Sequence, residues 1–233
     1  MYRLGSTPTE APMTTGTDNS PAKRVTKRRG QTRQRLLDAA ADAFSESGFG
    51  HATVEQICER GGYSRGAFYS NFDSLDELFF AMWEQRSAAM LADLRLATES
   101  ITAGNTVDIH AAVARIVAVV PVDPQWYRIN AEFTAHALRN PALRKALADR
   151  EDAILRTLLP IVEAALSDVG RTIVGDPTAL GRALVAVHDG TSVQCLVDTD
   201  TNAAFALRRD IFTRILLSYS EIIQNNQSKE ELS

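Results

Sequence analysis

Apolar residues return at helical spacing along most of the chain, and polar or glycine-containing breaks separate the segments. Between Gln31 and Ser47, for example, the apolar stripe consists of Leu36, Leu37, Ala40, Ala41 and Phe44. A repeat every three or four positions builds one face of a helix, whereas a half-buried strand alternates every second residue. No such alternation and no hairpin dipeptide stands out, so the pattern predicts an all-α fold.

Start and stop signals predict about nine helices. Thr53 with Gln56, and Ser74 with Glu77, have the spacing of a capping box, and Ser64 can cap a further helix. We expect helices over residues 31–47, 53–60, 64–71, 74–99, 107–120, 124–139, 141–168, 177–197 and 202–224. A break at Gly104-Asn105 separates the fourth helix from the fifth.

The second and third of these helices are short and are joined by Gly61-Gly62. Their apolar residues fall on the faces that would meet, namely Val54, Ile57 and Cys58 in one helix and Ala67 and Phe68 in the other. This arrangement is typical of a helix-turn-helix, whose second helix enters the DNA major groove. We therefore expect a three-helix DNA-binding unit over residues 31–73, a helical body over 74–224 and a frayed tail over 225–233.

The second helix of this motif begins with polar positions that the pattern leaves exposed. Ser64, Arg65 and Gly66 would meet base edges, and Tyr69 follows one turn later. Arg65 can donate two hydrogen bonds to guanine, a contact that discriminates between bases by roughly 1–3 kcal/mol, although an arginine here can also be simply solvated. The glycine would let the backbone approach DNA closely.

Charge is unevenly distributed along the chain. Residues 21–72 carry nine Lys or Arg and five Asp or Glu, a net charge of +4, although the whole chain has a net charge of -4. A basic segment attached to an acidic remainder indicates a polyanionic partner for the basic segment alone. We expect residues 1–30 to form a disordered basic arm. Its cations Lys27, Arg28 and Arg29 are either solvated or reach DNA phosphates or the minor groove.

The last two predicted helices carry more apolar surface than one neighbour can cover. Residues 177–197 are apolar most of the way round, and residues 202–224 carry a wide stripe from Phe205 to Ile223. Helices of this kind either lie inside the monomer or form a four-helix interface with a second copy. Because a helix-turn-helix that reads a palindrome generally works as a two-fold dimer, we expect a homodimer through these helices.

Other functional classes lack their signatures in this sequence. There is no nucleophile elbow, P-loop or metal-ligand spacing, so we expect neither an enzyme nor a bound metal or cofactor. Cys58 and Cys195 form no disulfide framework, no secretory signal opens the sequence, and no apolar run is long enough to cross a membrane. These features predict a cytoplasmic protein.

Clefts between bundled helices are usual sites for small ligands. The fourth, sixth and eighth predicted helices offer aromatic residues and one histidine that could line such a pocket, although residues at this spacing are also common in a plain core. These candidates are Trp83, Trp126, Tyr127, Phe133 and His188. We therefore expect a small-molecule effector to be largely apolar.

Residues 32–80 resemble the N-terminal part of the TetR family of transcriptional regulators, in the sequence TRQRLLDAAADAFSESGFGHATVEQICERGGYSRGAFYSNFDSLDELFF. The resemblance consists of a helix, a Gly-Phe turn, a helix begun by threonine, a glycine turn, Ser-x-Gly-x-Phe-Tyr, Asn-Phe and an acidic helix start. It implies an all-helical, dimeric regulator that binds DNA and a small effector. The remaining chain matches the family only in its general layout.

The resemblance also implies DNA contacts at individual positions. Thr32 and Thr53 match helix starts that contact phosphate in the family, and Tyr69 matches a tyrosine that donates to phosphate. Asn71 matches a position close to the DNA backbone. The turn and the start of the recognition helix correspond to Tyr63, Ser64, Arg65 and Gly66.

One position departs from the family pattern. The family commonly opens its fourth helix with Ser-Lys-Glu and places the lysine on a phosphate, whereas this chain has Ser74-Leu75-Asp76. We hypothesise that Lys27, Arg28 and Arg29 supply the missing positive charge.

The combined expectation is a ligand-responsive repressor that leaves a palindromic operator when a small molecule binds. The alternative is a helical interaction module whose DNA site has decayed and binds DNA without specificity. Activation rather than repression is also open, because it depends on where the operator lies relative to a promoter.

Overall fold

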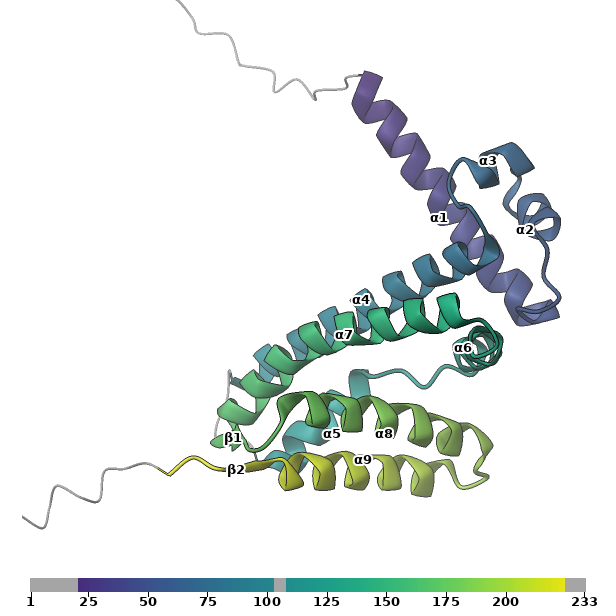
Figure 1. Cartoon of the computed structure of the whole chain (residues 1–233). Helices are drawn as coiled ribbons and strands as arrows, with labels where there is room; N and C mark the ends of the chain where they lie inside the picture. Colours follow the sequence, from purple (N-terminus) through teal and green to yellow (C-terminus); the bar gives the residue numbers. More distant parts are fainter. Residues whose placement is uncertain (1–20, 103–107, 225–233) are drawn as a thin grey trace, which may run out of the picture.

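The computed structural model describes residues 21–102 and 108–224 (Figure 1). Over these ranges the chain forms nine α-helices and one small sheet, so the predicted all-α class is confirmed. Residues 1–20 of the predicted arm, the predicted break at Gly104-Asn105 and the predicted tail 225–233 lie outside the described residues.

Three helices lie at one end of the molecule, and a long helix leads from them into a helical body (Figure 1). In the body α7 lies along α4, and α8 lies along α9. The elements in chain order are α1 (Pro21–Ser47), α2 (Val54–Gly61), α3 (Arg65–Tyr69), α4 (Leu75–Thr102), α5 (Ile109–Val119), α6 (Pro124–Ala137), α7 (Pro141–Asp168), β1 (Arg171–Ile173), α8 (Pro177–Val197), α9 (Thr201–Ser218) and β2 (Ser220–Ile222).

The predicted disordered arm is wrong for residues 21–30, which form the first turns of α1. This segment is rich in lysine and arginine, both of which favour helix, and it continues directly into the amphipathic part of α1. Extending an existing helix is much easier than nucleating one, because each added residue gains a hydrogen bond. The same basic residues that suggested disorder therefore lengthen the helix.

The ninth predicted helix ends at Ser218 rather than at residue 224. The chain then forms β2, which pairs antiparallel with β1, so that Arg171 lies opposite Ile222 and Ile173 opposite Ser220. The Arg171 guanidinium reinforces the pair by donating to the Ser220 hydroxyl at 2.9 Å. Strands of three residues are too short to show a period of two in the sequence, which is why both were missed.

The predicted helix starts are formed by the expected caps. The Thr53 hydroxyl accepts the Gln56 N–H at 3.2 Å, and the Gln56 side chain accepts the Thr53 N–H at 2.9 Å. The Ser64 hydroxyl likewise accepts an N–H of the first turn of α3. At Ser74 only half of the predicted box forms: the Ser74 hydroxyl accepts the Glu77 N–H, but the Glu77 carboxylate accepts the N–H of Asp73 instead of that of Ser74.

The largest apolar core joins the three N-terminal helices to α4 and α6. Phe133 of α6 is fully buried there, stacked on Phe79 of α4 with 3.6 Å between ring centroids. Phe49, in the turn after α1, meets Phe133 edge-on at 5.0 Å. Full burial of one such side chain contributes about 1.5–3 kcal/mol, so these rings fix α6 firmly against the N-terminal helices.

A polar contact fixes the same turn. Gly48 ends α1 with a φ of 81°, and the Glu132 carboxylate of α6 accepts the Phe49 N–H at 2.6 Å. A Cβ atom added to Gly48 would lie 2.8 Å from Glu132 Oε2. Glycine therefore serves two purposes, since it permits the left-handed backbone and leaves room for the carboxylate.

We expect Gly48→Ala to lower the free energy of unfolding by about 1–3 kcal/mol, because alanine disfavours the left-handed conformation and crowds Glu132. Urea unfolding followed by circular dichroism measures the change. Gly50→Ala is the matched control, since its added Cβ meets nothing within 4 Å and should change stability by less than about 0.5 kcal/mol. Equal effects of the two substitutions would contradict this role of Gly48.

Candidate DNA interface and ligand cavity

The α3 helix has one buried and one exposed side. Phe68 is fully buried in the core, as expected, whereas Ser64, Arg65 and Gly66 are exposed and Tyr69 is 49% exposed. The turn before α3 forms because Gly62 takes a φ of 71° and caps α2. The residues predicted to read DNA therefore share an open surface at the N-terminal end of α3.

Arg65 has two partners on this surface. Its guanidinium lies 2.7 Å from the Glu55 carboxylate of α2 and 5.9 Å from the centre of the Tyr69 ring. The side chains of Arg65 and Glu55 are both more than half exposed, and exposed ion pairs exchange readily with other partners. Glu55 can thus hold Arg65 in place without preventing it from reaching a base edge.

The cations of α1 lie on the same end of the molecule. Lys27, Arg28 and Arg29 are exposed, and the Arg29 guanidinium donates to the Ser70 carbonyl at the end of α3 at 3.2 Å. Figure 1 shows the N-terminal half of α1 extending past α3. Thr32 is half-buried, and its hydroxyl donates to the Arg28 carbonyl at 3.1 Å.

The remaining predicted DNA-binding residues differ in how accessible they are. Thr53 is exposed at the start of α2, and Tyr63 is half-buried against the core. The Asn71 amide donates to the Ala67 carbonyl at 2.8 Å, so its donor group is turned back onto α3. Leu75, which stands where the family has lysine, packs partly buried against the same core.

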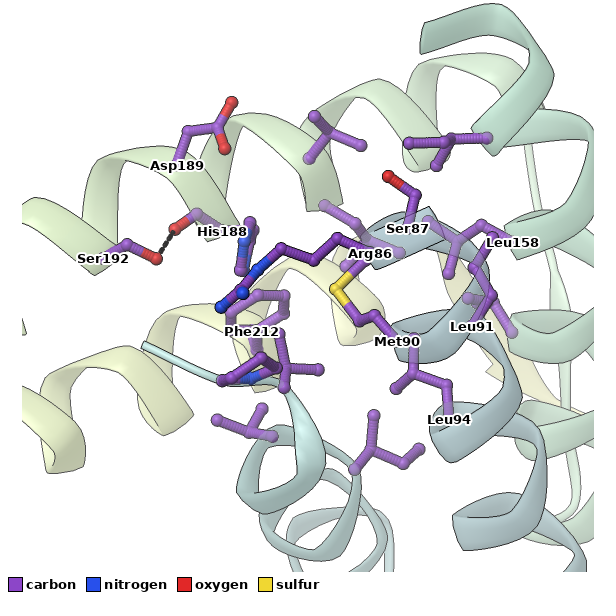
Figure 2. Close-up of a pocket in the computed structure, with 18 of the residues that line it drawn as sticks. Arg86, Ser87, Met90, Leu91, Leu94, Leu158, His188, Asp189, Ser192 and Phe212 are labelled. Atoms are coloured by element: carbon purple, nitrogen blue, oxygen red, sulfur yellow. Dashed lines mark hydrogen bonds between the residues drawn. The ribbon is translucent and has the colours of Figure 1, made fainter. Parts of the chain in front are cut away.

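A cavity of about 300 Å³ lies within the body, bounded by α4, α5, α6, α7, α8 and α9. Most of its wall is aliphatic, and Figure 2 shows Met90, Leu91, Leu94 and Leu158 gathered on one side. His188 and Phe212 lie on the other side, and the Arg86 side chain extends toward them. The cavity is therefore an apolar chamber with polar groups at one end.

Four of the five predicted pocket residues, namely Trp83, Trp126, Tyr127 and His188, line this cavity. The prediction for Phe133 is wrong, because its side chain is fully buried in the core of the N-terminal helices. Along α6 the cavity-facing positions follow helical spacing through Trp126, Asn130 and Thr134, and Phe133 belongs to the adjacent face of the helix.

Sequence reasoning missed the charged residues of the cavity region. Asp123 caps α6 by accepting the N–H groups of Gln125 and Trp126, and it also pairs with Arg86 of α4 on the cavity wall. Burial opposes ionisation of this carboxyl, but these donors outweigh it and lower the pKa of Asp123. Arg208 was also missed, although a signal existed, since it interrupts the apolar stripe between Phe205 and Phe212.

Together the fold and the two sites define a helix-turn-helix regulator with a ligand cavity in its helical body. Residues 36–82 match the model of bacterial regulatory proteins of the tetR family, and residues 106–216 match the C-terminal model of BetI-type transcriptional repressors. The two matched ranges cover about two thirds of the chain. The chain belongs to the TetR family and is a DNA-binding transcriptional regulator, a class that works as homodimers on operator DNA and binds small-molecule ligands.

Individual relatives of the chain are also transcriptional regulators. The chain is 28% identical to the transcriptional regulator AcrR of Shigella flexneri over 61% of this chain and 70% of that protein. It is 27% identical to the transcriptional repressor AcnR of Corynebacterium efficiens, over 60% and 68%. It is 29% identical to the transcriptional regulator TcmR of Streptomyces glaucescens, over 73% and 83%.

Solved structures share the fold. A TetR-family regulator from Mesorhizobium loti superposes with a TM-score of 0.62 at 17% identity, covering 82% of this chain and 96% of that one. A transcriptional regulator from a Rhodococcus species gives 0.60 at 22% identity, covering 80% and 97%. Within residues 21–102 and 108–224, none of the helices is both long and apolar enough to span a membrane.

Proposed function

We propose that this regulator is a cytoplasmic repressor that leaves a palindromic operator when a small, largely apolar effector occupies the cavity. The observation that carries this proposal is the position of α6, which contributes to the cavity wall and to the core of the N-terminal helices at once. The two buried thiols are consistent with a reducing compartment.

Two faces of α6 make these two sets of contacts. Trp126 and Tyr127 line the cavity, whereas Glu132 and Phe133 hold the turn at Phe49. A ligand that fits better when α6 is displaced would therefore also displace the turn between α1 and α2. Effector binding and DNA binding would then favour different conformers of the protein. Each ligand can shift the equilibrium between these two conformers only by the difference in its affinity for them.

For the DNA contacts, we propose that Arg65 reads a base edge while the other exposed residues bind the backbone. The support is the shared open surface of Ser64, Arg65, Gly66 and Tyr69. Backbone contacts would also come from Thr32, Thr53 and Tyr63, and from Lys27, Arg28 and Arg29 along α1. Asn71 would contribute only after its amide leaves the Ala67 carbonyl.

We place the dimer interface on α8 and α9. Eight large apolar residues are exposed by more than a third in the described part of the chain, and five of them fall between residues 197 and 223. Within this group Val197 ends α8, and Leu207 and Leu217 lie on α9. Apolar surface concentrated in this way is typical of an interface that a second copy covers.

The DNA-reading proposal can be tested by selecting bound sites from random duplex DNA at about 150 mM salt. We expect a palindromic motif whose half-sites are centred about one helical turn apart. Arg65→Ala should then reduce the preference for one base pair in each half-site by roughly 5- to 150-fold, because that is the usual range for a bidentate contact with guanine. Competition binding with single-base operator variants measures the preference.

The matched control replaces Lys27, Arg28 and Arg29 with glutamine. If these residues contact phosphates, the triple variant should bind all sequences more weakly, with a shallower salt dependence and an unchanged motif. Recovery of no motif from wild-type protein, with binding that disappears as salt rises, would instead indicate a decayed and non-specific DNA site.

The interface proposal predicts that Leu207→Glu weakens self-association by at least about tenfold, because it places a charge in an apolar contact. Sedimentation equilibrium over a range of protein concentrations measures the change. Leu96→Glu is the matched control, since Leu96 is 64% exposed on α4 and lies outside the proposed interface. A Leu207→Glu protein that dimerises as tightly as wild type would place the interface elsewhere.

A further inference from the structure

Arg208 of α9 is the largest fully buried side chain in the described part of the protein, and it lies behind the cavity wall rather than in it. Its guanidinium lies 5.2 Å from the centre of the Phe212 ring, which does line the cavity. A buried guanidinium is costly unless its N–H groups find acceptors. The identity of those acceptors therefore indicates what the arginine is for.

All of the acceptors come from one turn of α8. Arg208 Nη1 donates to the Thr191 hydroxyl at 2.7 Å and lies 3.2 Å from both the Ser192 hydroxyl and the His188 carbonyl. Thr191 and Ser192 donate their own hydroxyl hydrogens to helix carbonyls, each at 2.6 Å. Their oxygens are thus fixed as acceptors, and the chain of donation runs from Arg208 through the two hydroxyls to the carbonyls of α8.

The remaining acceptor is the ring of His188, whose Nδ1 lies 2.9 Å from Arg208 Nη2. Arginine can only donate, so Nδ1 must carry the lone pair and the ring hydrogen must lie on Nε2. Burial, assisted by the positive charge of Arg208, lowers the pKa of His188 to about 4, so the ring stays neutral at pH 7.

Because Nδ1 is taken by Arg208, Nε2–H is the ring group left for the cavity. His188 lines the cavity wall, and Figure 2 shows its ring directed from α8 toward the region where Phe212 and the end of Arg86 lie. Among the described residues no side chain or carbonyl accepts from Nε2, and this atom is not one of the enclosed, unpaired polar atoms of the structure. An accessible donor without a protein partner is available to a ligand.

The charges around this donor disfavour a charged ligand. Arg86 is already paired with Asp123. Glu151 and Asp189 also line the cavity, and their carboxyls have no hydrogen-bond or ion-pair partner within residues 21–102 and 108–224. Partial burial and neighbouring carboxylates raise the pKa of both acids. An anion would meet these two carboxyls, and a cation would find no free acceptor on the His188 ring, whose Nδ1 is taken by Arg208.

We infer that Arg208 holds the His188 ring as a hydrogen-bond donor toward the cavity, and that the effector is an uncharged, mainly aliphatic molecule with a carbonyl-type acceptor. The acceptor would lie at the His188 end, and the aliphatic part would lie against Met90, Leu91 and Leu94. This inference rests on the proposed function of the cavity as the effector site.

The test uses four probes that share an eight-carbon chain. They are octan-2-one, its isostere 2-methyloct-1-ene, octanoate and octyltrimethylammonium. Both tryptophans of the chain line the cavity, so quenching of intrinsic fluorescence reports occupancy without a label. Each probe is titrated into wild-type protein, His188→Phe and the control His110→Phe, whose histidine is exposed on α5 and does not line the cavity.

We expect the ketone to bind wild-type protein more tightly than either charged probe. His188→Phe should weaken ketone binding by about two- to tenfold, the usual range for one hydrogen bond, while leaving the alkene within about twofold. His110→Phe should change neither. Unchanged ketone affinity in His188→Phe, or tightest binding of octanoate or of the ammonium probe, would overturn the inference while leaving the cavity as a ligand site. If none of the four probes binds, the proposed function of the cavity fails as well.

A second measurement tests the role of Arg208 separately from binding. Long-range proton–nitrogen spectra of histidine-labelled protein at pH 7 should show His188 with its hydrogen on Nε2. In Arg208→Met, provided that circular dichroism shows retained helix, the ring should populate both tautomers. A wild-type His188 that is protonated on Nδ1 would overturn the proposed positioning.

Discussion

The contact between α6 and the turn at Phe49 is the constraint on which the rest of this structure depends. Glu132 accepts the Phe49 N–H, and Phe133 packs against the Phe49 ring. Without these contacts the N-terminal helices would be joined to the body mainly through α4, because α6 completes their apolar core. The position of the recognition helix is thus tied to the position of a helix that also bounds the cavity.

The same helix forms part of the cavity wall. Asp123 begins α6, caps its first N–H groups and pairs with Arg86 of α4, so the start of the helix is fixed by charge. The opposite wall, on α8, is fixed by the buried guanidinium of Arg208 behind His188. A rigid polar end and an aliphatic remainder favour ligands that are oriented by one acceptor and bound by apolar contact.

The sequence was most informative where local rules determine structure. The caps at Thr53 and Ser64 and the exposed start of α3 depend on nearby residues, so their positions could be predicted. The assignment of Phe133 failed because two adjacent faces of α6 are both apolar, and only tertiary packing decides which one meets the cavity. Arg208 was overlooked because its acceptors lie on another helix. The helical form of residues 21–30 was missed because composition alone suggested disorder.

The most direct test of the account measures the distance between the two recognition helices of the dimer. A spin label at Ser70→Cys is suitable, because Ser70 is exposed and both native cysteines are buried. For wild-type protein we expect one narrow distance distribution compatible with half-sites about 34 Å apart. For Glu132→Ala, which releases the Phe49 turn, we expect a broader or displaced distribution. Superimposable distributions for the two proteins would contradict the claim that α6 sets the spacing of the DNA-binding helices.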